Sequence, residues 1–394
     1  MLDDQIVIVA AKRTPLGTFQ GVFQNTSAPQ LGSIAIQGVL DMIEISAAQI
    51  DEVLMGCVLS SGLGQAPARQ AALGAGLANS THCVTVNKVC GSGMKAVMLA
   101  YDQLKLNDAH TIIAGGMESM SNAPYLLPKA RSGYRFGHGQ VLDHMLLDGL
   151  EDAYQKNTPM GIFAENTAER YNFSRQDQDA FVIKSAERAL QAMQTGAFKD
   201  EITAVTVKDR KGILEVSEDE PPSKVLFDKI PNLKPVFREG GTVTAASSSS
   251  LSDGAAAIVM MRSKDAQAQG LRPLAILHGH ASHSHEPEWF TTAPINAIQK
   301  LCQKLSWSLQ EVDLFEINEA FAVVPMAAIK ELGLSHERVN IHGGACALGH
   351  PIGATGARVI VTLLHALMRH NLKKGIASVC IGGGEATAIG LEVF

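Results

Sequence analysis

One cysteine of the sequence lies where a nucleophile could act. Cys90 follows an apolar run at 83–86 that predicts a strand, and it precedes a helical stripe of apolar residues at 94–105. The turn between them, Asn-Lys-Val-Cys-Gly-Ser-Gly at 87–93, ends in small residues that permit close approach of a substrate. The N–H groups and dipole at the start of a helix are expected to lower the thiol pKa from ~8.5 towards ~7 or less. This setting favours a nucleophilic Cys90 over a buried structural cysteine.

A nucleophilic thiol needs a base, and His350 is the candidate. It lies in a turn with five glycines, at 343–356, that opens a predicted helix. Histidine transfers protons near neutral pH, although a loop histidine can also be purely structural. A glycine-rich loop before a helix could instead bind phosphate, but the spacing matches neither the Walker nor the dinucleotide pattern.

Two further polar positions follow predicted strands. Cys380 ends the apolar run 376–379 and enters Gly-Gly-Gly at 382–384, whose backbone N–H groups could form an oxyanion hole. Asn318 opens Asn-Glu-Ala-Phe after the predicted strand 314–317, at a strand end where α/β folds often place site residues. Taken alone, a strand-end cysteine is more often structural, and an asparagine here more often caps a helix.

The elements that would hold these residues occur twice in the same order. Short apolar runs alternate with helical patterns, which predicts an α/β fold. The corresponding pairs are the segments 51–56 and 313–317, the strand ends at Val86 and Val339, and the segments 114–118 and 381–385. Because the order is kept, we predict two similar α/β halves that face each other, ahead of chance matching of short apolar strings.

The middle of the chain breaks this order. Residues 119–245 carry aromatic and glycine-rich loops, and a long helix that Ser174 could cap together with Asp177 three residues on. Such an insertion usually carries specificity. We therefore divide the chain into three parts: an N-terminal half at 1–118 with 246–270, an inserted loop domain at 119–245, and a C-terminal half at 271–394.

Composition excludes several classes of protein. The 394 residues are 46% hydrophobic and 18% charged, with a net charge of −6, so neither disorder nor nucleic-acid binding is expected. The six cysteines form no Cys-x-x-Cys pair, which argues against a zinc or redox site and fits a reducing compartment. The N-terminus begins acidic, unlike a signal peptide or mitochondrial presequence, and no run reaches the ~18 apolar residues of a membrane span. We expect a cytoplasmic protein that does not enter a membrane.

Four of these segments together resemble the signature blocks of the thiolase family. The blocks are Asn-Lys-Val-Cys-Gly-Ser-Gly at 87–93, Asn-Glu-Ala-Phe at 318–321, Gly-His-Pro-Ile-Gly at 349–353 and Cys-Ile-Gly-Gly-Gly at 380–384. Segments 114–120 and 239–245 match as well, and the resemblance runs from Ile6 to the C-terminus in family order. Within the family, the chain looks most similar to the short-chain acetyl-CoA acetyltransferases.

The resemblance implies a fold, an assembly and a reaction. The fold is the thiolase fold, with the two α/β halves in a five-layered α-β-α-β-α arrangement, and the assembly is a homotetramer built from tight dimers. The reaction is the reversible condensation of two acetyl-CoA to acetoacetyl-CoA and CoA, with a broad-chain degradative 3-ketoacyl-CoA thiolase as the alternative. Coenzyme A enters as substrate and product, and neither a metal nor another cofactor is expected.

The resemblance also implies catalytic roles. Cys90 attacks an acyl-CoA, His350 takes its proton, and Cys380 exchanges the α-proton of the second acetyl-CoA. One oxyanion hole would use His350 and a water held by Asn318. The other would use the backbone N–H groups of Cys90 and Gly382. The second cysteine argues against the single-cysteine condensing enzymes that share the fold, and the presence of both Cys90 and His350 argues against a non-catalytic acyl-CoA carrier.

Substrate contacts follow from the same resemblance. Ser249 would contact the pantetheine arm of CoA, while Met160 and Phe290 would close the acyl pocket. Lys224 and Lys229 are candidates for the nucleotide phosphates, with a solvated surface as the alternative. Leu150 is a further candidate substrate contact. The chain departs from the usual pattern in two places, since Ser247-Ser-Ser249 replaces Asn-Ala-Ser and Pro159 stands where many short-chain members have histidine.

Overall fold

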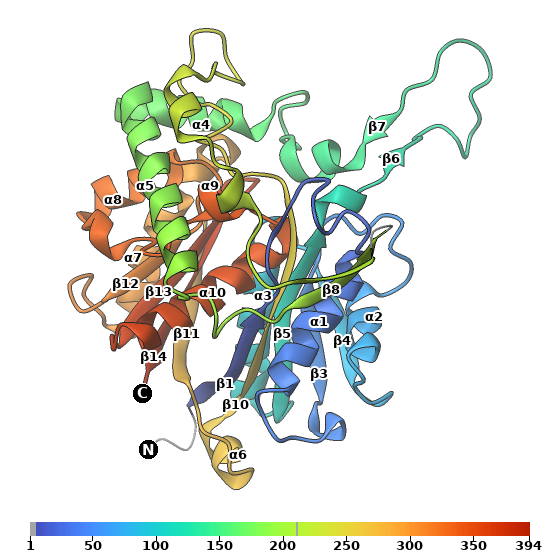
Figure 1. The fold of residues 1–394 in the computed structure, drawn as a ribbon, viewed down its shortest axis with the longest axis vertical. Helices are drawn as coiled ribbons and strands as arrows, with labels where there is room; N and C mark the ends of the chain where they lie inside the picture. The colour runs from blue at the N-terminus through green and yellow to red at the C-terminus, as the bar shows by residue number, and fades with distance from the viewer. Residues whose placement is uncertain (1–4, 210–211) are drawn as a thin grey trace.

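The computed structural model describes residues 5–209 and 212–394 and shows a mixed sheet with helices on its faces (Figure 1). The strands follow the order β12-β13-β14-β11-β1-β10-β5-β3-β4, and β2 pairs with β10. Their bounds are β1 (Ile6–Arg13), β2 (Gly17–Thr18), β3 (Glu52–Gly56), β4 (His82–Val86), β5 (Thr111–Ser119), β10 (Ser252–Arg262), β11 (Ala275–Ser284), β12 (Leu314–Ile317), β13 (Lys374–Ile381) and β14 (Glu385–Val393). The N-terminal and C-terminal parts of the sheet are joined by a short antiparallel pairing of β1 with β11. It runs from Ile6↔Leu277 to Ile8↔Ala275.

The two parts of the sheet repeat one topology. In the N-terminal part, β5 pairs parallel with β3 and antiparallel with β10, which pairs antiparallel with β1. In the C-terminal part, β13 pairs parallel with β12 and antiparallel with β14, which pairs antiparallel with β11. The counterpart of the edge strand β4 is a parallel bridge between Phe315 and Val339. The predicted duplication is therefore confirmed in the strand pairing.

Helices form three layers around these two parts. α1 (Ala28–Leu40) and α2 (Pro67–Gly74) pack on the outer face of the N-terminal part, and α7 (Ala293–Leu305) and α8 (Val323–Leu332) pack on that of the C-terminal part. Between the two parts lie α3 (Ser92–Leu106) and α10 (Ile352–Arg369), which contact both. Strand side chains alternate between faces, so Ile8 of β1 joins the central core while Val7 joins the outer one. The expected five-layered α/β arrangement is confirmed.

The central helix α10 positions the turn that carries His350. By length and composition it could cross a membrane, but every residue from Ile352 to Leu367 is buried in the protein, as in the core helix of a globular protein. Its contact with α3 is close. A Cβ on Gly93 would come within 3.0 Å of the Gly353 oxygen, and one on Gly356 within 2.2 Å of the Met94 nitrogen. The glycines therefore let the backbones of the two helices pack directly against each other. This also brings together the turns at their N-termini.

The segment between β5 and β10 covers one end of the sheet, in green and yellow in Figure 1. Its long helix α5 (Arg175–Gln194) begins as predicted, because Ser174 Oγ accepts the Asp177 N–H at 3.1 Å while the Asp177 carboxylate accepts the Ser174 N–H at 2.8 Å. A long loop between β6 and β7 extends away from the body (Figure 1). The other elements here are β6 (Tyr125–Leu126), β7 (Leu142–Asp143), a π-helical turn (Leu146–Leu150), α4 (Met160–Tyr171), β8 (Val205–Asp209) and β9 (Gly212–Val216).

Short helices complete the fold. They are α6 (Ser263–Ala268), α9 (Ala345–Leu348) and the 3₁₀ turns Ala47–Gln49, Met120–Asn122, Pro221–Lys224, Phe227–Asn232, Pro287–Thr292 and His336–Arg338. The boundaries assigned above to the inserted loop domain stay a prediction.

Candidate active site

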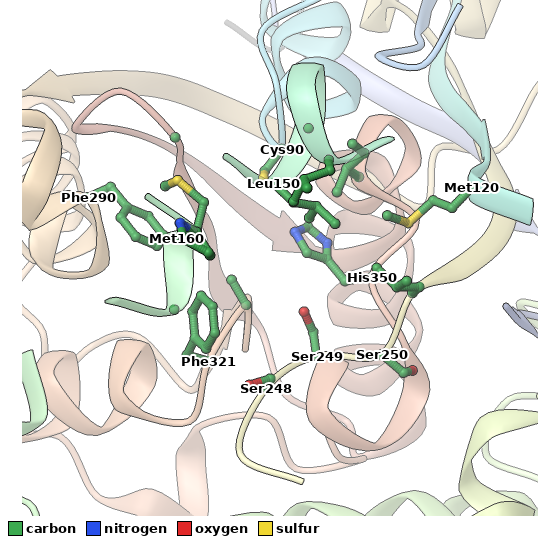
Figure 2. Close-up of a pocket in the computed structure, with 18 of the residues that line it drawn as sticks. Cys90, Met120, Leu150, Met160, Ser248, Ser249, Ser250, Phe290, Phe321 and His350 are labelled. Carbon is green, nitrogen blue, oxygen red and sulfur yellow. The ribbon is translucent and has the colours of Figure 1, made fainter. Parts of the chain in front are cut away.

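A cavity of about 210 Å³ collects most of the predicted site residues. Those that line it are Cys90, Leu150, Met160, Ser249, Phe290, His350 and Gly382. Figure 2 shows Met160 and Phe290 on one side of this cavity, Met120 on the other, and the His350 ring between Cys90 and Ser249. Both halves of the duplication and the segment between them therefore contribute to one cavity.

The backbone of the Cys90 turn is tightly constrained. Val89 has a φ of 46°, a left-handed conformation that a β-branched residue rarely adopts. The turn is held by Ser92, whose Oγ accepts the Lys88 N–H at 2.8 Å and donates to the Val89 oxygen at 2.6 Å. A Cβ on Gly91 would lie 2.3 Å from the Ile381 side chain, so this glycine lets the turn rest against the end of β13. Strain of this kind is characteristic of functional sites.

The predicted lowering of the Cys90 pKa is wrong. Burial raises the pKa of the Cys90 thiol to about 11, and the N–H groups of Gly382 and of Cys90 itself offset only part of that rise. The helix start at Ser92 is present as expected, but removing a charged sulfur from water costs more than the dipole and the N–H groups return. Cys90 is therefore a neutral thiol near pH 7, and a base must take its proton as it attacks.

His350 is suited to take that proton. Burial, followed by the charge of Arg358, lowers the pKa of His350 to about 3, so the ring is neutral at ordinary pH. The Thr355 hydroxyl donates its one proton to the Pro351 oxygen at 3.0 Å, so its oxygen accepts from His350 Nδ1–H at 2.6 Å. This arrangement assigns the proton to Nδ1 and leaves a lone pair on Nε2, the nitrogen that Asn318 Nδ2 approaches at 3.5 Å.

Cys380 and Asn318 lie beside the cavity rather than on its lining. Cys380 is fully buried at the end of β13. Burial, and next the charge of Cys90, raises the pKa of Cys380 well above its usual range, so the two sulfurs interact electrostatically. Asn318 is buried as well, and within residues 5–209 and 212–394 its Oδ1 has no hydrogen-bond partner. The structure thus brings two thiols, a neutral imidazole and a free amide oxygen together.

Comparison with known proteins assigns the family. Residues 6–264 match the thiolase N-terminal domain, and residues 271–393 match the thiolase C-terminal domain. The chain belongs to the thiolase family.

Relatives of this thiolase match along its whole length. An acetyl-CoA acetyltransferase of Schizosaccharomyces pombe is 48% identical and covers 100% of both chains, and one of Pseudomonas aeruginosa is 47% identical and covers 98% of both. Among solved structures, the Bacillus anthracis acetyl-CoA acetyltransferase has a TM-score of 0.96 at 40% identity and covers 99% of both chains. The Acat5 thiolase from Ascaris suum in complex with coenzyme A has a TM-score of 0.94 at 39% identity, over 99% of this chain and 100% of that one.

The two lysines of the thiolase predicted to meet phosphates lie outside the cavity lining. Lys224 Nζ pairs with Glu220 Oε1 at 2.5 Å and donates to Thr18 Oγ1 at 3.2 Å. Lys229 is exposed on the 3₁₀ turn Phe227–Asn232. Neither lysine is brought to the reacting groups, so any contact with CoA would be with a distant part of that molecule.

Phe237 and Thr355 are among the contributors to this site that sequence reasoning missed. Phe237 lines the cavity and lies directly over Gly161, where a Cβ would come within 2.3 Å of the ring. The sequence feature that could have indicated Phe237 is its position just before the segment 239–245, which matches the family pattern. Thr355, which sets the His350 tautomer, stands five residues after that histidine in the first turn of α10. Sequence spacing alone did not show which hydroxyl would face Nδ1.

Proposed function

We propose that this thiolase is an acetyl-CoA C-acetyltransferase, which joins two acetyl-CoA into acetoacetyl-CoA and CoA and catalyses the reverse. The observation that carries the proposal is the grouping of Cys90, His350 and Gly382 around one apolar cavity, with Cys380 buried beside it. The full-length likeness to proteins named acetyl-CoA acetyltransferase supports the same reaction. Cytoplasmic location and a homotetrameric assembly remain predictions.

The first half-reaction transfers an acetyl group to Cys90. As its sulfur attacks the thioester carbonyl, His350 Nε2 takes the thiol proton, and the departing CoA thiolate later receives it. The negative charge on the carbonyl oxygen is stabilised by the N–H groups of Cys90 and Gly382, which already face the sulfur. One preorganised donor of this kind is worth ~3 kcal/mol of barrier.

The second half-reaction forms the carbon–carbon bond. Cys380 acts as its thiolate and takes an α-proton from a second acetyl-CoA, and the resulting enolate attacks the acetyl carbonyl on Cys90. The Cys90 thiolate that leaves then takes this proton from Cys380, which returns to the thiolate form. Asn318, whose Oδ1 is free among the described residues, would hold the water that stabilises the enolate oxygen, with His350 as a second donor when its Nε2 carries a proton. Ser249 and Leu150 line the cavity where pantetheine would lie, and Lys224 and Lys229 remain candidates for the phosphates. All these steps use groups of this chain and its substrates.

Two experiments test the reaction and the nucleophile. With acetoacetyl-CoA and free CoA, the protein is expected to yield two acetyl-CoA, which neither a decarboxylating or hydroxymethylglutaryl-type condensing enzyme nor a non-catalytic carrier would do. After incubation with acetyl-CoA, mass spectrometry should find an acetyl-thioester on Cys90. An adduct on Cys380 or Cys346 instead would overturn the assignment.

The acyl end of the cavity predicts a short substrate chain. Phe290 is 3% exposed, with its ring 6.4 Å from that of Phe163 and 6.3 Å from that of Phe321, so it cannot easily move aside. Extra methylenes would clash with it, and overpacking of this kind costs ~1–3 kcal/mol. We expect kcat/KM to fall about 5- to 150-fold beyond four carbons in the 3-oxoacyl chain, and Phe290→Ala to restore longer chains.

A matched control separates the cavity wall from the core behind it. Phe173→Leu changes an aromatic side chain packed on the same core, whose ring stacks on that of Tyr171 and does not line the cavity, so its chain-length profile should match the wild type. The measurement is kcat/KM for 3-oxoacyl-CoA substrates of four to ten carbons. A flat wild-type profile, or a Phe290→Ala variant no more tolerant than wild type, would favour the broad-chain degradative thiolase instead.

A further inference from the structure

An ion pair links the two turns that meet at the Cys90 sulfur. Lys88 stands two residues before Cys90, and Glu385 stands three residues after Gly382. Their side chains form a direct Nζ–Oε2 pair, although 297 residues of chain separate them. The second carboxylate oxygen of Glu385 accepts a hydrogen bond from Ser284 Oγ at 3.0 Å, which fixes the carboxylate to β11.

The turn on the Gly382 side is a loop of three glycines between the paired residues Ile381 and Glu385 of β13 and β14. Gly383 and Gly384 have φ values of 91° and 83°, and glycine is the residue with the most backbone freedom. A Cβ on Gly384 would lie 2.3 Å from the His285 oxygen, so one end of the turn is pressed against the chain after β11. Glu385 is the first charged side chain after these glycines, and its partner is in the opposite half of the fold.

We propose that Lys88 and Glu385 are positioning residues, which hold the Gly382 N–H against the Cys90 sulfur and thereby set the rate of acyl transfer. The inference rests on the proposed function and deepens it. Neither side chain lines the cavity, so they act through the turns they tie together. Partial burial alone would raise the pKa of Glu385, but hydrogen bonds from Lys88 and Ser284 and the charge of Lys88 outweigh it and lower that pKa, so the Glu385 carboxylate is ionised near neutrality.

The effect on rate should exceed the effect on stability. The side chains are 25% and 33% exposed, and partly exposed pairs contribute little to folding. A donor displaced by about 1 Å can cost ~10²-fold in rate. We therefore expect Lys88→Met and Glu385→Gln each to lower kcat for thiolysis, and the rate of Cys90 acetylation, by roughly 10- to 100-fold. KM for CoA and the melting temperature should change little.

Three variants make the test decisive. The charge swap Lys88→Glu with Glu385→Lys should recover much of the lost rate, and Lys88→Arg should keep most of it. Lys374→Met removes another partly exposed ion pair, with Glu311 at 3.8 Å, and should leave kcat unchanged. The inference is overturned if single variants of an active enzyme keep the wild-type rate, or if Lys88→Arg loses as much as Lys88→Met. If the wild type itself fails to cleave acetoacetyl-CoA with CoA, it is the proposed function that fails.

Discussion

Cys380→Ser is expected to separate the two half-reactions. Acetylation of Cys90 depends on His350 and on the N–H groups of the turns, all of which remain, so the acetyl-thioester should still form. Condensation needs a base for the α-proton, and a serine hydroxyl is a far weaker acid than a thiol, so its conjugate base is not available. We expect the condensation rate to fall ~10²–10⁴-fold.

The measurement follows the two half-reactions separately. Quenched samples give the rate of Cys90 acetylation by mass spectrometry, and acetoacetyl-CoA formation gives the rate of condensation. Cys302→Ser changes a buried cysteine of α7 in the outer core and should leave both rates unaltered. If Cys380→Ser condenses at the wild-type rate, Cys380 is structural and the single-cysteine condensing enzymes become the better interpretation.

Local pattern was enough to predict where Cys90, the proposed nucleophile, lies in the fold. The strand at 83–86 became β4 and the helical stripe at 94–105 became α3, so Cys90 does lie in the turn between them. The duplication was also readable, because each strand pairs with neighbours close to it in the repeat. These features depend on residues near one another in the sequence, which periodicity reports.

The acidity of the Cys90 thiol could not be predicted in the same way. Met160 and Phe237 from the middle of the chain and Gly382 from near its end line the cavity with Cys90, and this enclosure removes the thiol from water. The pairing of Lys88 with Glu385 likewise depends on how the two halves meet. Contacts between distant segments leave no periodic signal, so only the folded structure shows them.

His350→Ala is expected to stop the first half-reaction, unlike Cys380→Ser. The Cys90 thiol has a pKa of about 11, so without a base almost none of it is thiolate at pH 7. We expect acetylation of Cys90 to fall ~10²–10⁴-fold at pH 7, the usual contribution of a positioned base. In the variant, this rate should rise about tenfold per pH unit on the way to pH 11, because only the thiolate fraction reacts.

The wild type should show no such slope. The pKa of His350 is lowered to about 3, so its Nε2 is already unprotonated from pH 5 upward, and histidine ionisation adds no rise in rate between pH 5 and pH 8. Thr355→Val removes the acceptor of Nδ1–H and should cause a smaller loss, since the ring stays but its tautomer and orientation are no longer held. His278→Gln, whose histidine pairs with Glu392 away from the cavity, serves as the control. A His350→Ala enzyme that acetylates Cys90 at the wild-type rate, or with no dependence on pH, would remove His350 from the role of base.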